Sequence, residues 1–376
     1  MSIGIICEYN PFHNGHLYQI NEIKKIYPDS TIICVMSSSF TERGDISILN
    51  KWDKTEIALK YGIDLVIELP FVFSSQSADI FAKGATNILN HLKVDKLIFG
   101  SETNDIGLLN KLVDIQLNNK NYDKLVKEYL DKGYNYPTAM SKSLYDLSKI
   151  KIDQPNDILG ISYIKELKKL KSNIEVETIK RTNDYHSTSL NNSIASATSI
   201  RLALQNNKNI KKYVPELTYK CLKNIKNFDN NYFSLLKYKI LSTQDLTIYQ
   251  TVDEGIDTRI KKYINECNTL DELINKIKTK RFTYNRIKRM LTHIICSFTK
   301  EEANNIEIEY IRILGFNNKG RNYLKNIKKN ISIPIITGYK NNNSKILNIE
   351  YRVTTIYSCI VNNNELIKKE LNKPIY

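Results

Sequence analysis

One stretch near the start of the chain indicates its fold class: Ile3-Gly4-Ile5-Ile6-Cys7-Glu8-Tyr9-Asn10-Pro11-Phe12-His13-Asn14-Gly15-His16. The apolar run over residues 3–7 predicts a buried strand, and apolar residues then recur at helical spacing from residue 17 to residue 27. In a parallel α/β fold, ligands bind at the turn where such a strand gives way to a helix. We therefore expect a ligand site within residues 8–16.

The same alternation continues along the chain, with further strands expected at residues 31–36, 65–69, 96–99 and 174–179. Helical patterns over residues 51–61 and 77–92 separate the early strands. Continuous apolar strands separated by helices are typical of a parallel sheet that is covered on both faces. We predict an α/β three-layer domain over residues 1–205.

The length of 376 residues suits two domains, and the second half differs from the first. A polar linker at residues 205–209 precedes helical periodicity through residue 298, so residues 206–376 are predicted to form a mostly helical domain. Residues 1–205 carry 24 basic and 24 acidic side chains, whereas residues 206–376 carry 31 and 16, so the excess of +15 lies in the second half. This asymmetry predicts a polyanionic partner, with nucleic acid favoured over an anionic membrane.

Several classes of protein are excluded by composition. The six cysteines include no CxxC pair, and the five histidines do not complete a zinc signature, so we predict no metal-ligating residues. No apolar run approaches the roughly 20 residues that span a bilayer, and the first residues lack the basic flank and cleavage site of a signal peptide. We expect a cytoplasmic protein with no membrane partner and no evident protein partner.

The turn after the first strand carries residues suited to nucleotide chemistry. His13 and His16 are three residues apart, so both imidazoles can face a ligand from the first helical turn, and Gly15 would let a flat base or ribose approach the backbone. The helix N-terminus adds free N–H groups for phosphate. Imidazole donors can stabilise a triphosphate during attack at its α-phosphorus. The alternative is two surface histidines at a helix start, but the position directly after strand one favours nucleotide binding.

A second motif, Ser196-Ala197-Thr198-Ser199-Ile200-Arg201, lies at the other end of the predicted α/β domain. It predicts a helix N-terminus that presents hydroxyls, with Arg201 one turn further on and directed toward the β- and γ-phosphates. A simple Ser/Thr cap with a surface arginine is the alternative. The two motifs in this order resemble the HxGH nucleotidyltransferase superfamily, relatives of the class I aminoacyl-tRNA synthetases, which implies a Rossmann-like parallel sheet.

More of the chain resembles a narrower group, the bacterial tRNA(Met) cytidine acetate ligase family. The similar segments are residues 8–16, 64–70, 99–102, 155–163, 179–181, 254–256, 278–284, 286–289 and 320–324. One segment departs from that family, which usually has a Gly-Asn pair and a Gly-Glu-Pro run after strand two. This chain has Ser37-Ser38-Ser39-Phe40-Thr41-Glu42-Arg43-Gly44-Asp45-Ile46 there, and we assign no site residues to it.

The resemblance implies an enzyme that joins ATP and acetate into acetyl-adenylate, releasing pyrophosphate, and then acetylates N4 of the wobble cytidine of elongator tRNA(Met). ATP is the implied substrate and Mg²⁺ is expected with it. The implied catalytic residues are His13, His16 and Arg201. The implied ATP-site residues are Ile6, Cys7, Glu8, Tyr9, Asn10, Pro11, Phe12, His13, Asn14, Gly15, His16, Leu17, Tyr18, Gln19, Gly100, Asn156, Arg181 and Ser199.

A basic cluster in the second half is the predicted tRNA-binding site: Lys276, Lys278, Lys280, Arg281, Arg286, Lys288 and Arg289. Phosphate contacts would give affinity, and the interleaved Phe282 or Tyr284 could stack on an unpaired anticodon base. For any single lysine, a solvated helix face is the alternative.

Two other functions share these motifs. A small-molecule adenylyltransferase would leave the basic second half without a purpose. A non-catalytic RNA-binding protein with the same fold would not need intact His13, His16 and Arg201.

Overall fold

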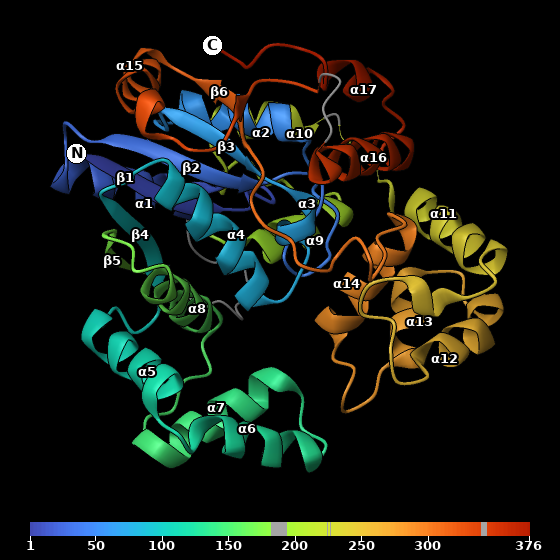
Figure 1. Ribbon diagram of the computed structural model, residues 1–376. Coiled ribbons are helices and arrows are strands. Elements are labelled where there is room, and N and C mark those ends of the chain that lie inside the picture. Colours follow the sequence, from blue (N-terminus) through green and yellow to red (C-terminus); the bar gives the residue numbers. More distant parts are fainter. Residues whose placement is uncertain (182–193, 224, 226, 340–343) are drawn as a thin grey trace.

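The structure, a computed structural model, describes residues 1–181, 194–223, 225, 227–339 and 344–376. Seven strands form one sheet in the order β5-β4-β1-β2-β3-β6-β7 (Figure 1). Five of them pair in parallel: β1 (Ser2–Cys7), β2 (Thr31–Ser37), β3 (Leu65–Leu69), β4 (Lys96–Ser101) and β5 (Glu175–Lys180). The predicted Rossmann-like parallel sheet is confirmed.

Alternate residues of the central strands enter two separate cores. On β2, Ile33 and Val35 belong to a core shared with α4 (Ala78–His91) and α8 (Pro155–Lys169). Ile32 and Cys34 belong to a second core shared with α1 (Asn14–Ile26) and α2 (Lys51–Lys60). Both sets are fully buried, because successive side chains of a strand point to opposite faces of a sheet and helices cover both faces here.

The last part of the chain returns to this sheet. Strand β6 (Ile311–Phe316) pairs antiparallel with β3, and the short β7 (Ile335–Ile336) pairs with β6. The sheet therefore includes residues from both sides of the predicted domain boundary at residue 205. The division into two domains stays a prediction. The pattern of residues 311–316 did not predict β6 as a strand.

Buried ion pairs fasten β6 to the sheet. Arg312 Nη1 lies 3.1 Å from Glu68 Oε2, and Arg312 also pairs with Glu370. Lys51 Nζ lies 2.5 Å from Glu68 Oε1 and 2.6 Å from Glu370 Oε1. All four side chains are almost completely buried, so removal of any one would leave an uncompensated charge in the core.

The remaining helices include one group that lies apart from the sheet. Between β4 and β5 come α5 (Ile106–Asn118), α6 (Tyr122–Asp131) and α7 (Tyr136–Ser148), and α6 and α7 form a hairpin that stands away from the sheet (Figure 1). The other elements are α3 (Phe71–Ser74), α9 (Ala197–Gln205), α10 (Glu216–Lys223), α11 (Asp229–Ser242), α12 (Ile256–Tyr263), α13 (Leu270–Ile277), α14 (Tyr284–Ile295), α15 (Asn318–Ile327), α16 (Lys345–Ile360), α17 (Glu365–Lys369) and 3₁₀ turns at Leu246–Ile248, Ile264–Glu266 and Lys328–Asn330. Among the described residues, no helix has the length and apolar content needed to cross a bilayer.

Candidate nucleotide and RNA site

A cavity of about 2130 Å³ opens at the carboxyl ends of β1 and β4. Most of the predicted ATP-site residues line it, and so does the predicted catalytic residue Arg201. These ATP-site residues are Ile6, Cys7, Glu8, Tyr9, Asn10, His13, His16, Gln19, Gly100, Asn156 and Arg181. The others do not line the cavity: Pro11, Phe12, Asn14, Gly15, Leu17, Tyr18 and Ser199. The fold therefore gathers most of the predicted nucleotide site in one place.

The two histidines occupy the start of α1, with His13 as the N-cap residue. The backbone N–H of Gly15 donates to His13 Nδ1 at 3.0 Å, and the backbone N–H of His13 donates to His16 Nδ1 at 3.2 Å. A ring nitrogen that accepts a hydrogen bond carries no proton, so both neutral imidazoles are protonated at Nε2. Within the described residues neither Nε2 has a hydrogen-bond partner, and both remain available as donors.

Both imidazoles are neutral in the free protein. Burial, with Arg181 and Arg201 nearby, lowers the pKa of His13 to about 3. Burial, with His13 and Arg181 nearby, holds the pKa of His16 well below its ordinary value. Two neutral N–H donors beside two arginines form a site suited to the oxygen atoms of a polyanion.

Gly15 has a steric role beside His13. It does not line the cavity, and a Cβ there would lie 2.8 Å from Cε1 of His13. The missing side chain therefore makes room for the imidazole of His13. The approach of a base or ribose to the backbone at Gly15 stays a prediction.

Ser199 also lies away from the cavity surface. Its backbone N–H donates to the Ser196 hydroxyl at 3.1 Å, and the two hydroxyls lie 2.8 Å apart, so Ser199 is part of the cap of α9. Ser196 and Thr198 line the cavity instead. The hydroxyls expected from this helix N-terminus are present at the cavity, but they come from neighbouring positions.

A buried lysine that the sequence analysis missed lies beneath the site. Lys54 Nζ donates to the carbonyls of Glu8 at 3.1 Å, Ser37 at 2.7 Å and Ser38 at 2.8 Å. Burial lowers the pKa of Lys54 to about 7, with the nearby Glu8 carboxylate opposing that shift. Lys54 therefore ties together the ends of β1 and β2. Only tertiary contacts distinguish it from the other lysines of α2.

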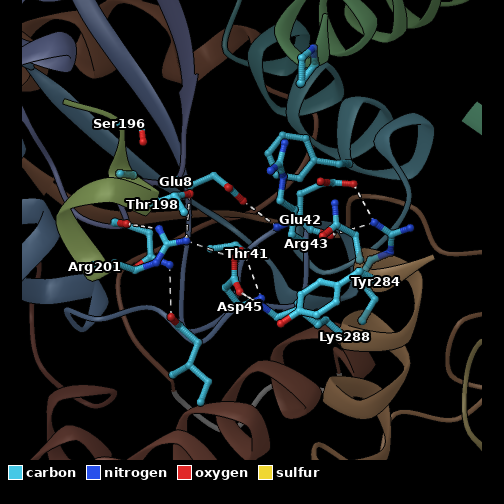
Figure 2. Close-up of a pocket in the computed structure, with 18 of the residues that line it drawn as sticks. Glu8, Thr41, Glu42, Arg43, Asp45, Ser196, Thr198, Arg201, Tyr284 and Lys288 are labelled. Carbon is cyan, nitrogen blue, oxygen red and sulfur yellow. Dashed lines mark hydrogen bonds and ion pairs between the residues drawn. The ribbon is translucent and has the colours of Figure 1, made fainter. Parts of the chain in front are cut away.

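The loop after β2, to which no site residue was assigned, connects the side of the cavity where Arg201 lies to α14 (Figure 2). Arg201 Nη1 donates to the Asn10 carbonyl at 2.7 Å, and its Nη2 lies 3.5 Å from Asp45 Oδ2. The other oxygen of Asp45 pairs with Lys288. Asp45 thus joins the arginine expected at the triphosphate to a lysine expected at the RNA.

Further contacts fix this loop. Arg289 Nη1 lies 3.0 Å from Glu42 Oε1, and the Glu42 backbone N–H donates to Glu8 Oε1 at 2.6 Å. Gly44 has a φ of +76°, and a Cβ there would lie 2.5 Å from the backbone nitrogen of Arg289. The loop is therefore packed directly onto α14. The signal that could have found it is its position after the second strand of a parallel sheet.

On the opposite side, two residues predicted from separate segments, Asn156 and Arg181, converge on Glu102. Asn156 Nδ2 donates to Glu102 Oε1 at 2.5 Å, and Arg181 Nε lies 3.5 Å from the same oxygen. The Cγ of Arg181 would lie 3.3 Å from a Cβ at Gly100. The buried Asp157 accepts the Glu102 backbone N–H at 3.1 Å and so holds this loop in place.

The predicted RNA-binding residues separate into two sets. Lys288 and Arg289 are half-buried inside the cavity in the ion pairs above, and Arg281 and Arg286 line its outer part. The exposed residues Lys276, Lys278 and Lys280 lie outside it.

The aromatic residues of this cluster differ from expectation. Phe282 is buried, with the guanidinium of Arg286 4.2 Å from its ring centroid, so it cannot stack on a base. Tyr284 lines the cavity, and its hydroxyl donates to Asp271 at 2.5 Å. Of the two expected aromatic residues, only Tyr284 is placed for such a contact.

The chain is similar throughout its length to known proteins. The family model of the HIGH Nucleotidyl Transferase matches residues 1–372. The tRNA(Met) cytidine acetate ligase of Anoxybacillus flavithermus is 39% identical and aligns over 99% of both chains. The enzyme of the same name from Clostridium tetani is 38% identical over 99% of this chain and 98% of its own.

Solved structures of Thermotoga maritima TmcAL are similar in fold. The apo form superimposes with a TM-score of 0.89 at 30% identity, over 100% of this chain and 99% of that chain. A second structure, bound with alpha-thio ATP, gives a TM-score of 0.88 with the same identity and coverage.

Proposed function

This chain belongs to the HIGH nucleotidyl transferase family and, within it, to the tRNA(Met) cytidine acetate ligases, and we propose that it acetylates N4 of the wobble cytidine of elongator tRNA(Met) with ATP and acetate. We propose that it acts in the cytoplasm, where these substrates meet. One observation carries the proposal: two neutral imidazoles and Arg201 line the same cavity as the basic residues of α14. A nucleotide and an RNA nucleobase can therefore share one cavity.

The first step is activation of acetate. A carboxylate oxygen of acetate attacks the α-phosphorus of ATP, the bond to the bridging oxygen of pyrophosphate breaks, and acetyl-adenylate forms. His13 and His16 donate hydrogen bonds from Nε2 to phosphate oxygens as negative charge builds on them. Arg201 leaves Asp45 to contact the β- and γ-phosphates. Positioning and electrostatic stabilisation accomplish this step, without a covalent enzyme intermediate.

The second step is transfer to RNA. The exocyclic N4 of cytidine attacks the acetyl carbonyl carbon, the carbon–oxygen bond to AMP breaks, and the amine proton passes to solvent. The anticodon loop is single-stranded, so the target base can be turned out of its stack without melting a duplex. The arginines of α14 that line the cavity, Arg281 and Arg286, would hold the flanking phosphates.

We propose that Mg²⁺ enters with ATP. Among the residues that the structure describes, no three His, Cys, Asp or Glu side chains gather into a site for a metal ion. Phosphate oxygens and water provide the oxygen ligands that Mg²⁺ prefers. Bound Mg²⁺ would neutralise charge on the triphosphate, and the protein contributes Arg201 and the two imidazoles.

The test is incubation of the purified protein with ¹⁴C-acetate, ATP and elongator tRNA(Met). Label in N4-acetylcytidine at the wobble position supports the proposal. Adenylyl transfer to a small metabolite without labelled tRNA would support a small-molecule adenylyltransferase instead. Binding of tRNA without any ATP turnover would support a non-catalytic RNA-binding protein. A tRNA whose wobble base is uridine serves as the matched control and should remain unlabelled.

A further inference from the structure

The α6–α7 hairpin carries exposed aromatic side chains that no step above uses. Tyr134 is 40% exposed, Tyr136 45% and Tyr145 48%, all within twelve residues of the chain. The hairpin stands apart from the sheet and from the group formed by α12, α13 and α14 (Figure 1). The hairpin therefore presents three tyrosine rings to a binding partner of this enzyme.

Two of these tyrosines face the site already described. Tyr134 and Tyr136 line the same cavity as His13 and His16, whereas Tyr145, further along α7, does not. From the opposite side, α14 contributes Tyr284 to that cavity. Aromatic residues from two separate elements therefore flank the entrance to the predicted nucleotide site.

Cations accompany these rings. Lys142 Nζ lies 5.1 Å from the ring centroid of Tyr134 and 5.7 Å from that of Tyr129. Lys132 Nζ lies 5.2 Å from the Tyr129 centroid. Each lysine is thus held beside an aromatic face, an arrangement in which the ring helps to fix the position of the cation. A fixed cation beside an exposed ring matches the chemistry of a nucleotide, which offers a phosphate next to a flat base.

We propose that the α6–α7 hairpin is a second RNA-binding surface, on which an unpaired base flanking the wobble cytidine stacks against Tyr134 or Tyr136 while Lys142 contacts a neighbouring phosphate. The anticodon loop then lies between this hairpin and α14, with the wobble base directed toward His13 and His16. Stacking suits this role because every base has an aromatic face, so the contact holds the loop without reading its sequence. The inference rests on the proposed function for the identity of the RNA.

A single-stranded nucleic acid fits this surface better than a protein partner does. The rings alternate with lysines instead of forming a continuous apolar patch, and the surface continues into a cavity that ends at a nucleotide site. A protein partner would have no need of a surface that continues into the cavity. An RNA loop must extend from the hairpin into the cavity to place its target base there.

The experiment measures binding of a fluorescent anticodon stem-loop of elongator tRNA(Met) to the full chain, for Tyr134→Ala, Tyr136→Ala and the double variant. We expect the double variant to bind on the order of tenfold to a hundredfold more weakly. Tyr145→Ala is the matched control, since it removes an equally exposed tyrosine of the same hairpin outside the cavity, and its binding should change less than twofold. Tyr134→Phe keeps the ring and should restore wild-type binding at that position.

Acetate-dependent exchange of pyrophosphate into ATP, measured without RNA, serves as the second readout. It should remain within twofold of wild type in every hairpin variant, because the proposed surface touches only RNA. Unchanged RNA binding in the double variant would overturn the inference, and so would equal losses in the double variant and Tyr145→Ala. Absence of pyrophosphate exchange in the wild-type protein would count against the proposed function. The binding measurements would still show whether the hairpin contacts RNA.

Discussion

His13 and His16 lie with their ring centroids 3.8 Å apart at the first turn of α1, and a backbone N–H occupies Nδ1 of each ring. The backbone of the helix start therefore fixes the protonation of both imidazoles. Each side chain caps the helix with one nitrogen and keeps the other for a ligand. The same hydrogen bonds that start the helix also prepare the site.

Substitution of His16 tests the role of this pair. His16→Asn removes one Nε2 donor, and we expect acetate-dependent pyrophosphate exchange to fall by on the order of a hundredfold or more, as when a single donor to a developing oxyanion is lost. Affinity for tRNA should stay within twofold. His91→Asn is the control, since His91 lies in the last turn of α4 and does not line the cavity. Equal loss of exchange and tRNA binding in a folded His16 variant would contradict this division of roles.

Gly15→Ala tests the steric argument for His13. The added methyl group would lie 2.8 Å from His13 Cε1 and must displace that imidazole. We expect pyrophosphate exchange to fall at least tenfold while the thermal midpoint changes little. The control is Gly107→Ala, at the second position of α5, where the new Cβ meets only Asp105 Oδ1 at 3.3 Å. Full activity of Gly15→Ala would show that the position of His13 is not critical.

Neutralising the exposed basic residues tests the RNA surface on the other side of the cavity. Lys280 and Arg281 are both exposed, so Lys280→Ala with Arg281→Ala should weaken tRNA binding and leave pyrophosphate exchange intact. Two lost phosphate contacts should lower the slope of log affinity against log salt by about 1.4 to 1.8. Lys328→Ala with Lys329→Ala, at an exposed 3₁₀ turn outside the cavity, is the control. An unchanged salt slope would argue that these two side chains do not meet phosphate.

Acid should destabilise the fold through its buried histidines. Burial lowers the pKa of His13 to about 3 and that of His293 to about 4, both below the ordinary value of 6.5. Between these values and 6.5 the unfolded chain binds more protons than the folded one, so stability is complete above pH 6.5 and falls as the pH decreases through that window. Each group should contribute about 2 kcal/mol of loss between pH 7 and pH 5.

Urea unfolding at several pH values measures this effect. His293 Nε2 lies 2.7 Å from the Ser75 carbonyl, and Gln at position 293 can donate to that carbonyl without titrating. His293→Gln should therefore have a shallower dependence of unfolding free energy on pH than wild type. An identical slope in the two proteins would exclude His293 as one of the titrating groups.

The sequence predicted the parallel strands well, because β1 to β4 are mostly apolar runs between helical patterns. It did not predict β6, since the buried Arg312 interrupts that run and makes sense only beside Glu68 and Glu370, which are distant in the chain. The sequence also did not show whether a given side chain points into the core or toward solvent. Phe282 stands among basic residues in the sequence but is buried in the core.

At the site, the motif residues were predictable and their supporting contacts were not. The positions of His13, His16 and Arg201 follow from where their motifs fall relative to strands and helices. Asp45 and Lys54 act through contacts with residues far along the chain or with backbone carbonyls, and a single sequence does not contain that information.

Oxygen transfer from acetate shows whether acetyl-adenylate forms in this cavity. If acetate attacks the α-phosphorus in this cavity, a reaction with [¹⁸O₂]acetate, ATP and elongator tRNA(Met) must leave one ¹⁸O in the released AMP and one in the acetyl group on cytidine. Mass spectrometry of AMP and of the wobble nucleoside measures the ¹⁸O content of each product. AMP without ¹⁸O, or ADP as the product in place of AMP, would contradict an acetyl-adenylate formed at His13, His16 and Arg201.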